Sequence, residues 1–184
     1  MGKQVMVLNG SPRANGNTEA LSDALIRGAQ KAGHTASKYN IRSMEIKPCL
    51  GCYQCVAGKG NPCVQKDDMQ EIYDALNQAD VVVFSSPLYW WHLTAQMKTV
   101  IDRIFGLAAA NGMKILKKET VLLIAAEDTA EENFEQIIPY YQTCLVKNLN
   151  WDDRGMILAG GVNMPGDVEK TEYMEEAEAL GASL

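Results

Sequence analysis

The chain alternates between short apolar runs and longer stretches in which apolar residues recur with helical spacing. The runs Gln4–Asn9, Asp80–Ser86 and Thr120–Ala126 lack a polar face, which is typical of parallel strands that are covered on both sides. Weaker patterns predict two further strands, at Thr35–Asn40 and Arg154–Val162.

Between these strands, apolar side chains recur at the three- to four-residue spacing of an amphipathic helix. The pattern predicts five helices, over Thr18–Ala32, Asp67–Gln78, Thr94–Phe105, Glu131–Asn148 and Val168–Leu180. Pro139 should kink or divide the fourth helix, because proline lacks a backbone N–H and clashes with the preceding turn.

Strands that alternate with helices indicate an α/β fold with a doubly wound parallel sheet in three layers. Five strands favour the strand order 2-1-3-4-5 over the six-stranded dinucleotide fold. In that order, ligands bind beyond the carboxyl ends of strands one and three, so we expect a site in the loops after Asn9 and Ser86. We expect residues 1–184 to form a single domain with a Cys-rich insertion at about residues 47–66.

The acidic composition of the chain limits the classes of partner that it can be expected to bind. The 184 residues include 17 Lys and Arg against 23 Asp and Glu, a net charge of -6, which counts against a nucleic-acid or anionic-membrane partner. No apolar run approaches the roughly 18 residues of a membrane helix. Because Met1 leads into a strand without a signal-peptide pattern, we expect a cytoplasmic location. A phosphate ligand should then be bound by neutral donors.

The loop from Gly10 to Thr18 follows a buried strand and enters a helix, where free backbone N–H groups favour an anion. It lacks the Lys of a nucleoside-triphosphate loop and the glycine spacing of a dinucleotide fingerprint, which leaves a monophosphate as the natural ligand. A tight turn with a Ser/Thr cap and no ligand is the alternative. The candidate binding residues are Ser11, Arg13, Asn15, Asn17 and Thr18.

The loop Ser85–His92 places a proline, a tyrosine and two tryptophans at the carboxyl end of the central strand. Exposed aromatic side chains there could form a platform for a flat ring. Trp90 and Trp91 could instead pack in a subunit interface, and both roles are compatible. His92 could donate a proton, although a histidine beside aromatic residues is more often structural.

Together, the segments GSPRANGNT and SSPLYWWHLTAQMKTVIDR resemble the NADPH-dependent FMN reductase family of flavodoxin-like proteins, over roughly Val5 to Val162. The resemblance implies a flavodoxin-like fold, FMN with its phosphate in the loop from Ser11 to Thr18, and a homodimer or tetramer with the flavin near the subunit boundary. It also implies that the isoalloxazine lies along Pro87, Leu88, Tyr89 and Trp90.

The third loop that would contact a flavin follows the strand Thr120–Ala126. Many relatives have a Gly-rich turn there, whereas this chain has Glu127, Asp128 and Thr129. The departure leaves the contacts of the two acids open, and they could repel anionic substrates.

Four of the five cysteines form the pattern C-x2-C-x2-C-x7-C, at Cys49, Cys52, Cys55 and Cys63. Ferredoxins use C-x2-C-x2-C to ligate iron–sulfur clusters, and the spacing resembles the iron-sulfur flavoprotein branch of the same superfamily, which implies a [4Fe-4S] cluster. Zinc, free thiols and a redox disulfide between Cys49 and Cys52 remain open. Cys144 is expected to be a buried apolar residue.

Two functions follow from these patterns. The first is an NAD(P)H oxidoreductase that passes a hydride through FMN to a quinone, a nitro or azo compound, or a flavin. No catalytic side chain is expected, because the flavin carries the chemistry. The alternative is an iron-sulfur flavoprotein that carries electrons between a ferredoxin-like donor, a [4Fe-4S] cluster and FMN. A plain flavodoxin is a third option.

Overall fold

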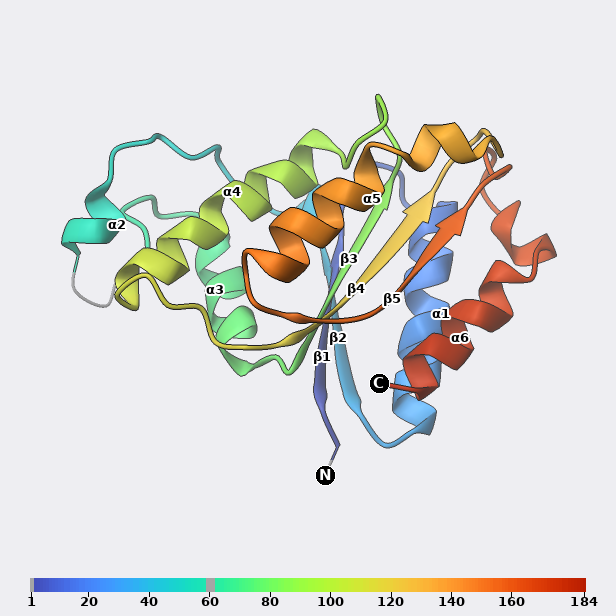
Figure 1. The fold of residues 1–184 in the computed structure, drawn as a ribbon, viewed down its shortest axis with the longest axis horizontal. Coiled ribbons are helices and arrows are strands. Elements are labelled where there is room, and N and C mark those ends of the chain that lie inside the picture. The colour runs from blue at the N-terminus through green and yellow to red at the C-terminus, as the bar shows by residue number, and fades with distance from the viewer. Residues whose placement is uncertain (1, 59–61) are drawn as a thin grey trace.

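The computed structural model describes residues 2–58 and 62–184 and shows a five-stranded parallel sheet (Figure 1). The strand order is β2-β1-β3-β4-β5, so the predicted order 2-1-3-4-5 is confirmed. The strands are β1 Gln4–Asn9, β2 Thr35–Asn40, β3 Val81–Pro87, β4 Glu119–Ala125 and β5 Asp152–Ala159.

Helices cover both faces of the sheet, with α1 and α6 on one side and α3, α4 and α5 on the other (Figure 1). Their bounds are α1 Asn17–Lys31, α2 Gln54–Ala57, α3 Met69–Gln78, α4 Ala95–Ala110, α5 Ile137–Tyr140 and α6 Tyr173–Ala182. Single-turn helices lie at Ile41–Ser43, Glu131–Phe134 and Val168–Lys170, and a π-helix at Tyr141–Lys147.

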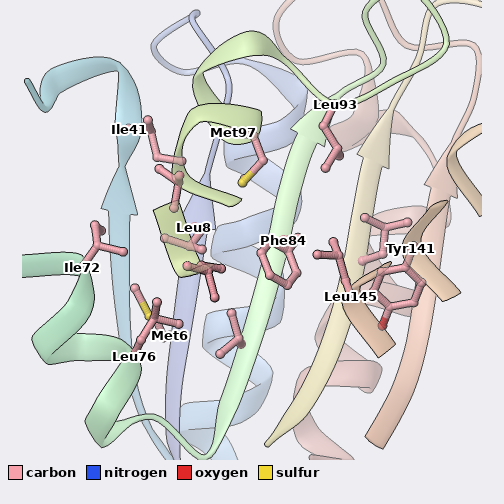
Figure 2. Packing of buried hydrophobic residues seen from close by; sticks show 14 of the residues in the cluster. Met6, Leu8, Ile41, Ile72, Leu76, Phe84, Leu93, Met97, Tyr141 and Leu145 are labelled. Carbon is pink, nitrogen blue, oxygen red and sulfur yellow. The ribbon is translucent and has the colours of Figure 1, made fainter. Parts of the chain in front are cut away.

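The core is divided by the sheet, because successive side chains of a strand point to opposite faces. Met6, Leu8 and Phe84 pack beneath α3, α4 and the π-helix (Figure 2). Val5 and Val7 belong to the second cluster, with residues of α1 and α6. Both faces of the central strands are therefore buried, which explains why the sequence shows no polar alternation there.

The sequence predicts that the segment Glu131–Asn148 is helical and is kinked or divided at Pro139; it is helical and divided, but the division does not lie at Pro139. The structure divides this segment into a 3₁₀ turn, the short helix α5 and the π-helix. The break lies at residues 135–136, before Pro139. Pro139 is tolerated in the first turn of α5, where a backbone N–H has no intrahelical acceptor.

Three other predicted bounds also differ. The last strand begins at Asp152, which pairs with Glu119 of β4, and it ends before a turn in which Gly161 has a φ of 76°. α4 continues past Phe105 to Ala110, since Leu107, Ala108 and Ala109 are buried. The C-terminal helix begins only at residue 173, after a separate turn.

The described part of the Cys-rich segment lies beside α4, with α2 at its far end (Figure 1). Close approach is possible because α4 carries Gly106, where a Cβ atom would lie 2.3 Å from the carbonyl oxygen of Pro62. In the described part of the chain, no helix is both long and apolar enough to cross a membrane.

Candidate functional site

The loops after β1, β3, β4 and β5 surround one cavity of about 490 Å³ at the carboxyl ends of the strands. This is the edge at which doubly wound sheets bind their ligands. The residues that line it include Ser11, Arg13, Gly16, Asn17, Thr18, Pro87, Leu88, Tyr89, Trp90, Trp91, Glu127, Asp128, Asn133 and Asn163.

Hydrogen bonds from buried neighbours shape the first loop. The hydroxyl of Thr94 donates to the carbonyl oxygen of Gly10 at 2.8 Å. The backbone N–H of Ser11 donates to Oδ1 of the buried Asn9 at 3.2 Å. The hydroxyl of Ser11 accepts the backbone N–H of Arg13 at 3.2 Å, so the loop is closed upon itself.

The start of α1 lies at this cavity and has no side-chain cap, since its N-cap residue is Gly16. The helix therefore offers unpaired N–H groups and the positive end of its dipole to a ligand. Glu19, in the first turn, accepts a hydrogen bond from the backbone N–H of Asn15 at 2.9 Å. Lys38 and Arg42 form ion pairs with this carboxylate.

Arg13 connects the first loop to the loop after β5. Its Nη1 donates to the carbonyl oxygen of Asn163 at 3.0 Å. Among the described residues that line the cavity, Arg13 is the one cation. The other polar groups that the first loop offers to the cavity are neutral.

The aromatic loop is a tight hairpin turn. The backbone groups of Tyr89 and His92 exchange hydrogen bonds at 2.9 and 3.1 Å. Between them, Trp90 and Trp91 have φ values of 49° and 57°, and their ring centroids lie 5.6 Å apart. Trp91 is held by a 2.8 Å hydrogen bond from its indole N–H to Asn133, while Trp90 is 88% exposed.

His92 lies outside the set of residues that line the cavity. Its ring contacts that of Tyr140 edge-on, with centroids 4.3 Å apart. Burial and, to a smaller extent, the charge of Lys98 hold the pKa of His92 below its ordinary value. His92 therefore packs against Tyr140 rather than facing the cavity.

The third loop contributes acids to the cavity wall, at Glu127 and Asp128. The backbone N–H of Ala130 donates to Asp128 at 3.0 Å, and this bond lowers the pKa of that carboxyl. Both side chains are exposed. The loop therefore places negative charge on the cavity wall.

A second cavity, of about 320 Å³, lies beside α4 and is lined by all four clustered cysteines. Cys49 and Cys52 are exposed, while Cys55 and Cys63 are half-buried. Within residues 2–58 and 62–184, no three Cys, His, Asp or Glu side chains are placed to hold a metal ion, and no disulfide joins Cys49 to Cys52.

The family model for NADPH-dependent FMN reductases matches residues 4–138. This chain belongs to that family. An iron-sulfur flavoprotein of Archaeoglobus fulgidus is 33% identical over 175 residues, which cover 95% of this chain and 76% of that protein. An iron-sulfur flavoprotein of Methanocaldococcus jannaschii is 34% identical over 122 residues, 66% of this chain and 60% of its own length.

The fold of this FMN reductase family member is similar to that of an NAD(P)H:quinone oxidoreductase from Methanothermobacter marburgensis. The TM-score is 0.80, with 20% identity and coverage of 100% of this chain and 96% of that one. The likeness supports the flavodoxin-like fold, and the family is one of NAD(P)H-dependent oxidoreductases.

In this FMN reductase family member, the structure brings together eight of the nine residues predicted from the sequence to bind a cofactor. Asn15 does not line the cavity, because its N–H is turned toward Glu19. Sequence reasoning missed Asn133, which lies in the single-turn helix Glu131–Phe134, and Asn163, which lies in the loop after β5. Cys144 is half-buried rather than buried, and it packs against the core cluster around Phe84.

Proposed function

We propose that this chain binds FMN in the 490 Å³ cavity and works as an NAD(P)H oxidoreductase. The observation that carries the proposal is the continuity of this cavity. It joins an uncapped helix N-terminus to a turn of exposed aromatic side chains. A molecule with a phosphate at one end and a flat ring at the other matches that arrangement.

At the phosphate end, the N–H groups at the start of α1 and the side chains of Ser11, Asn17 and Thr18 would receive the anion. Arg13 would add one positive charge from the edge of the cavity. Asn15 remains a predicted contact, and in this geometry it shapes the loop through Glu19.

At the ring end, Pro87, Leu88, Tyr89 and Trp90 would lie along the isoalloxazine. When bound, FMN would supply the redox chemistry, by accepting a hydride from NAD(P)H and passing two electrons to an acceptor. The protein would bind and orient the two partners, and no side chain of the chain need act as a nucleophile.

The acceptor class follows from the cavity wall. Glu127 and Asp128 place negative charge at the open side, so a neutral quinone, nitro compound or azo compound is favoured over a strongly anionic acceptor. We also propose a homodimer or tetramer, in which a second copy would cover Trp90.

The site proposal is tested by comparing FMN with riboflavin, which lacks the phosphate, in a fluorescence titration of the purified chain. FMN should bind at least tenfold more tightly. Replacing Thr18 by Val should reduce that preference, whereas replacing Lys98, outside the cavity, by Met should not. Equal affinity for the two flavins would contradict the assignment of the phosphate loop.

A second function is favoured by one observation, that the four clustered cysteines line a single cavity. Each iron at a corner of a [4Fe-4S] cluster takes one thiolate, so its ligands surround the cluster rather than converge on one point. Four soft thiolate donors in the C-x2-C-x2-C-x7-C spacing suit such a cluster. The chain would then carry electrons between a ferredoxin-like donor, the cluster and FMN.

Anaerobic purification followed by assays for iron and acid-labile sulfide tests this second function. Equal amounts of iron and sulfide, close to four of each per chain, are expected. Protein that takes up no iron after anaerobic reconstitution would exclude the cluster and leave the reductase proposal intact.

A further inference from the structure

We propose that Asn40 and Arg42, at the carboxyl end of β2, hold the loop from Gly10 to Thr18 in the shape that binds a phosphate. Neither residue lines the 490 Å³ cavity, so both are positioning residues that act through their neighbours. The inference rests on the proposed function, in which this phosphate loop receives the phosphate of FMN. It assigns a role to a strand end that belongs to neither loop motif.

The start of the phosphate loop is connected to β2 through two hydrogen bonds in series. The backbone N–H of Ser11 donates to Oδ1 of Asn9 at 3.2 Å, and Nδ2 of Asn9 donates to Oδ1 of Asn40 at 2.9 Å. Asn9 is completely buried, so its amide needs partners within the protein. The side chain of Asn40 supplies the acceptor and thereby fixes the direction in which the amide of Asn9 faces Ser11.

The far part of the phosphate loop is connected to the same strand end through Glu19. The backbone N–H of Asn15 donates to Oε2 of Glu19 at 2.9 Å. Nη1 of Arg42 lies 3.3 Å from that carboxylate oxygen and also donates to Oδ1 of Asn40 at 3.3 Å. Arg42 therefore joins the two paths, and the two parts of the loop are held relative to one another.

The turn that carries Arg42 is itself fixed. Ile41, the first residue of this turn, is 3% exposed and belongs to the core cluster. The hydroxyl of Ser43 donates to the carbonyl oxygen of Asn40 at 2.8 Å, which closes the turn. A support that is anchored in the core can hold the loop in its binding geometry before the ligand arrives.

Arg42 contributes more than positive charge. Lys38 also pairs with Glu19, at 3.1 Å, so this carboxylate keeps a cationic partner when Arg42 is replaced. The planar guanidinium additionally reaches Glu19 and Asn40 at once. A lysine at position 42 would carry the same charge on a single nitrogen, without the rigid fork of donors.

Two single variants and their combination test this role. Arg42→Lys keeps the charge but loses the fork, and Asn40→Ala removes the shared acceptor without a change in charge. Two variants serve as matched controls. Arg27→Lys makes the same exchange on the exposed face of α1, where Arg27 pairs with Glu178, and Thr35→Ala shortens an exposed polar side chain at the start of β2.

The affinities for FMN and for riboflavin are measured by fluorescence titration of each purified protein. Riboflavin lacks the phosphate, so the ratio of the two affinities reports on the loop, whereas general loss of structure weakens both. Each single variant should lower the FMN-to-riboflavin ratio by about threefold or more, the effect of one hydrogen bond. The double variant should lose less than the product of the two single losses, because the residues act in one network. Both controls should match the parent protein.

A parent-like ratio in either Arg42→Lys or Asn40→Ala would overturn the inference, while the preference of the parent protein for FMN would still support the phosphate loop. Losses that multiply fully in the double variant would also overturn it, since the two residues would then act independently. A parent protein that binds both flavins equally would overturn the phosphate loop and this inference together.

Discussion

Trp90 and Trp91 occupy backbone conformations that cost free energy. Both central residues of the Tyr89–His92 turn have positive φ, a geometry that hairpins usually assign to Asn or Gly. For a residue with a Cβ atom, the left-handed region costs about 1–2 kcal/mol. Strain of this kind is typical of functional sites, and here it places two large rings at the cavity.

Replacing Trp90 by Gly should therefore stabilise the chain while it weakens flavin binding. Relief of strain should add about 1 kcal/mol of stability, or about 2–4 °C in the thermal midpoint for a chain of this size. Loss of the ring should weaken FMN binding by up to about tenfold, since one aromatic pair contributes roughly 0.5–1.5 kcal/mol.

Trp90→Ala is the matched control, because it removes the same ring but keeps the strained conformation. It should lose affinity like the glycine variant without any gain in melting temperature. Equal thermal stability of the two variants would contradict the strain explanation.

The ionisation state of Glu19 affects the conformation of the proposed phosphate loop, because Glu19 accepts a hydrogen bond from Asn15. Burial raises its pKa, but the hydrogen bond from Asn15 and the charges of Lys38 and Arg42 outweigh this effect, so the pKa lies below the ordinary 4.5. Because the pKa of Glu19 is lower in the folded chain, ionised Glu19 stabilises the folded state. This stabilisation is complete above pH 4.5 and is lost as the pH falls through the lower, folded-state pKa.

FMN affinity should follow this titration. In the parent protein, binding should weaken below pH 4.5 as Glu19 takes up a proton and releases the N–H of Asn15. Glu19→Gln should bind FMN several-fold more weakly at pH 7 and should lack the Glu19 component of the acid profile. Identical profiles in a fluorescence titration would show that Glu19 does not position the loop.

At the scale of elements, the close approach of the Cys-rich segment to α4 at Pro62 requires a glycine at position 106. A methyl group at Gly106 would meet the carbonyl oxygen of Pro62 at 2.3 Å and the hydroxyl of Tyr73 at 3.0 Å. Gly106→Ala should push the segment that carries Cys63 away from the helix. Mass spectrometry should then show at least a severalfold faster alkylation of Cys63 by iodoacetamide, with FMN binding unchanged.

Gly112, just beyond the end of α4, supplies the control. Its φ is 68° and no atom lies within 4 Å of the Cβ position, so Gly112→Ala adds backbone strain of about 1–2 kcal/mol but displaces nothing. The alkylation rate of Cys63 should stay at the parent value in this variant. A similar increase in both variants would mean that general destabilisation, not the contact with Pro62, controls the thiol.

Elements could be predicted from the sequence where one physical pattern dominates. The buried strands β1, β3 and β4 were found because both of their faces are apolar. The segment after β4 was not, since the choice between α, 3₁₀ and π hydrogen bonding there depends on how Phe134, Ile137 and Tyr141 pack on the sheet. Local periodicity does not contain that information.

The same distinction applies to the site. The loops after β1 and β3 were predictable because ligand sites in this fold follow those strands. Asn163 reaches the cavity only through the path of the chain beyond β5. The burial of Arg103 depends on Lys47 and Asp67, which lie 56 and 36 residues away in the sequence, so no local pattern could reveal this buried ion pair.

At the scale of the whole molecule, two of the cavities among the described residues are candidate cofactor sites. The larger lies over the carboxyl ends of β1, β3, β4 and β5, and the smaller lies between α4 and the Cys-rich segment. We propose that residues 1–184 act as one domain, in which α4 connects the two sites. Its N-cap Thr94 donates to the carbonyl of Gly10 in the phosphate loop, and Arg103 lines the cysteine cavity.

The proposed function requires that the larger cavity holds FMN for reduction by a nicotinamide. It is tested most directly by anaerobic titration of the FMN-loaded protein with NADPH, and separately with NADH, while the visible absorption of the flavin is followed. At least one nicotinamide should bleach the bound flavin completely within seconds, and a quinone added afterwards should restore the absorption. Bound FMN that neither nicotinamide reduces would contradict the proposed function.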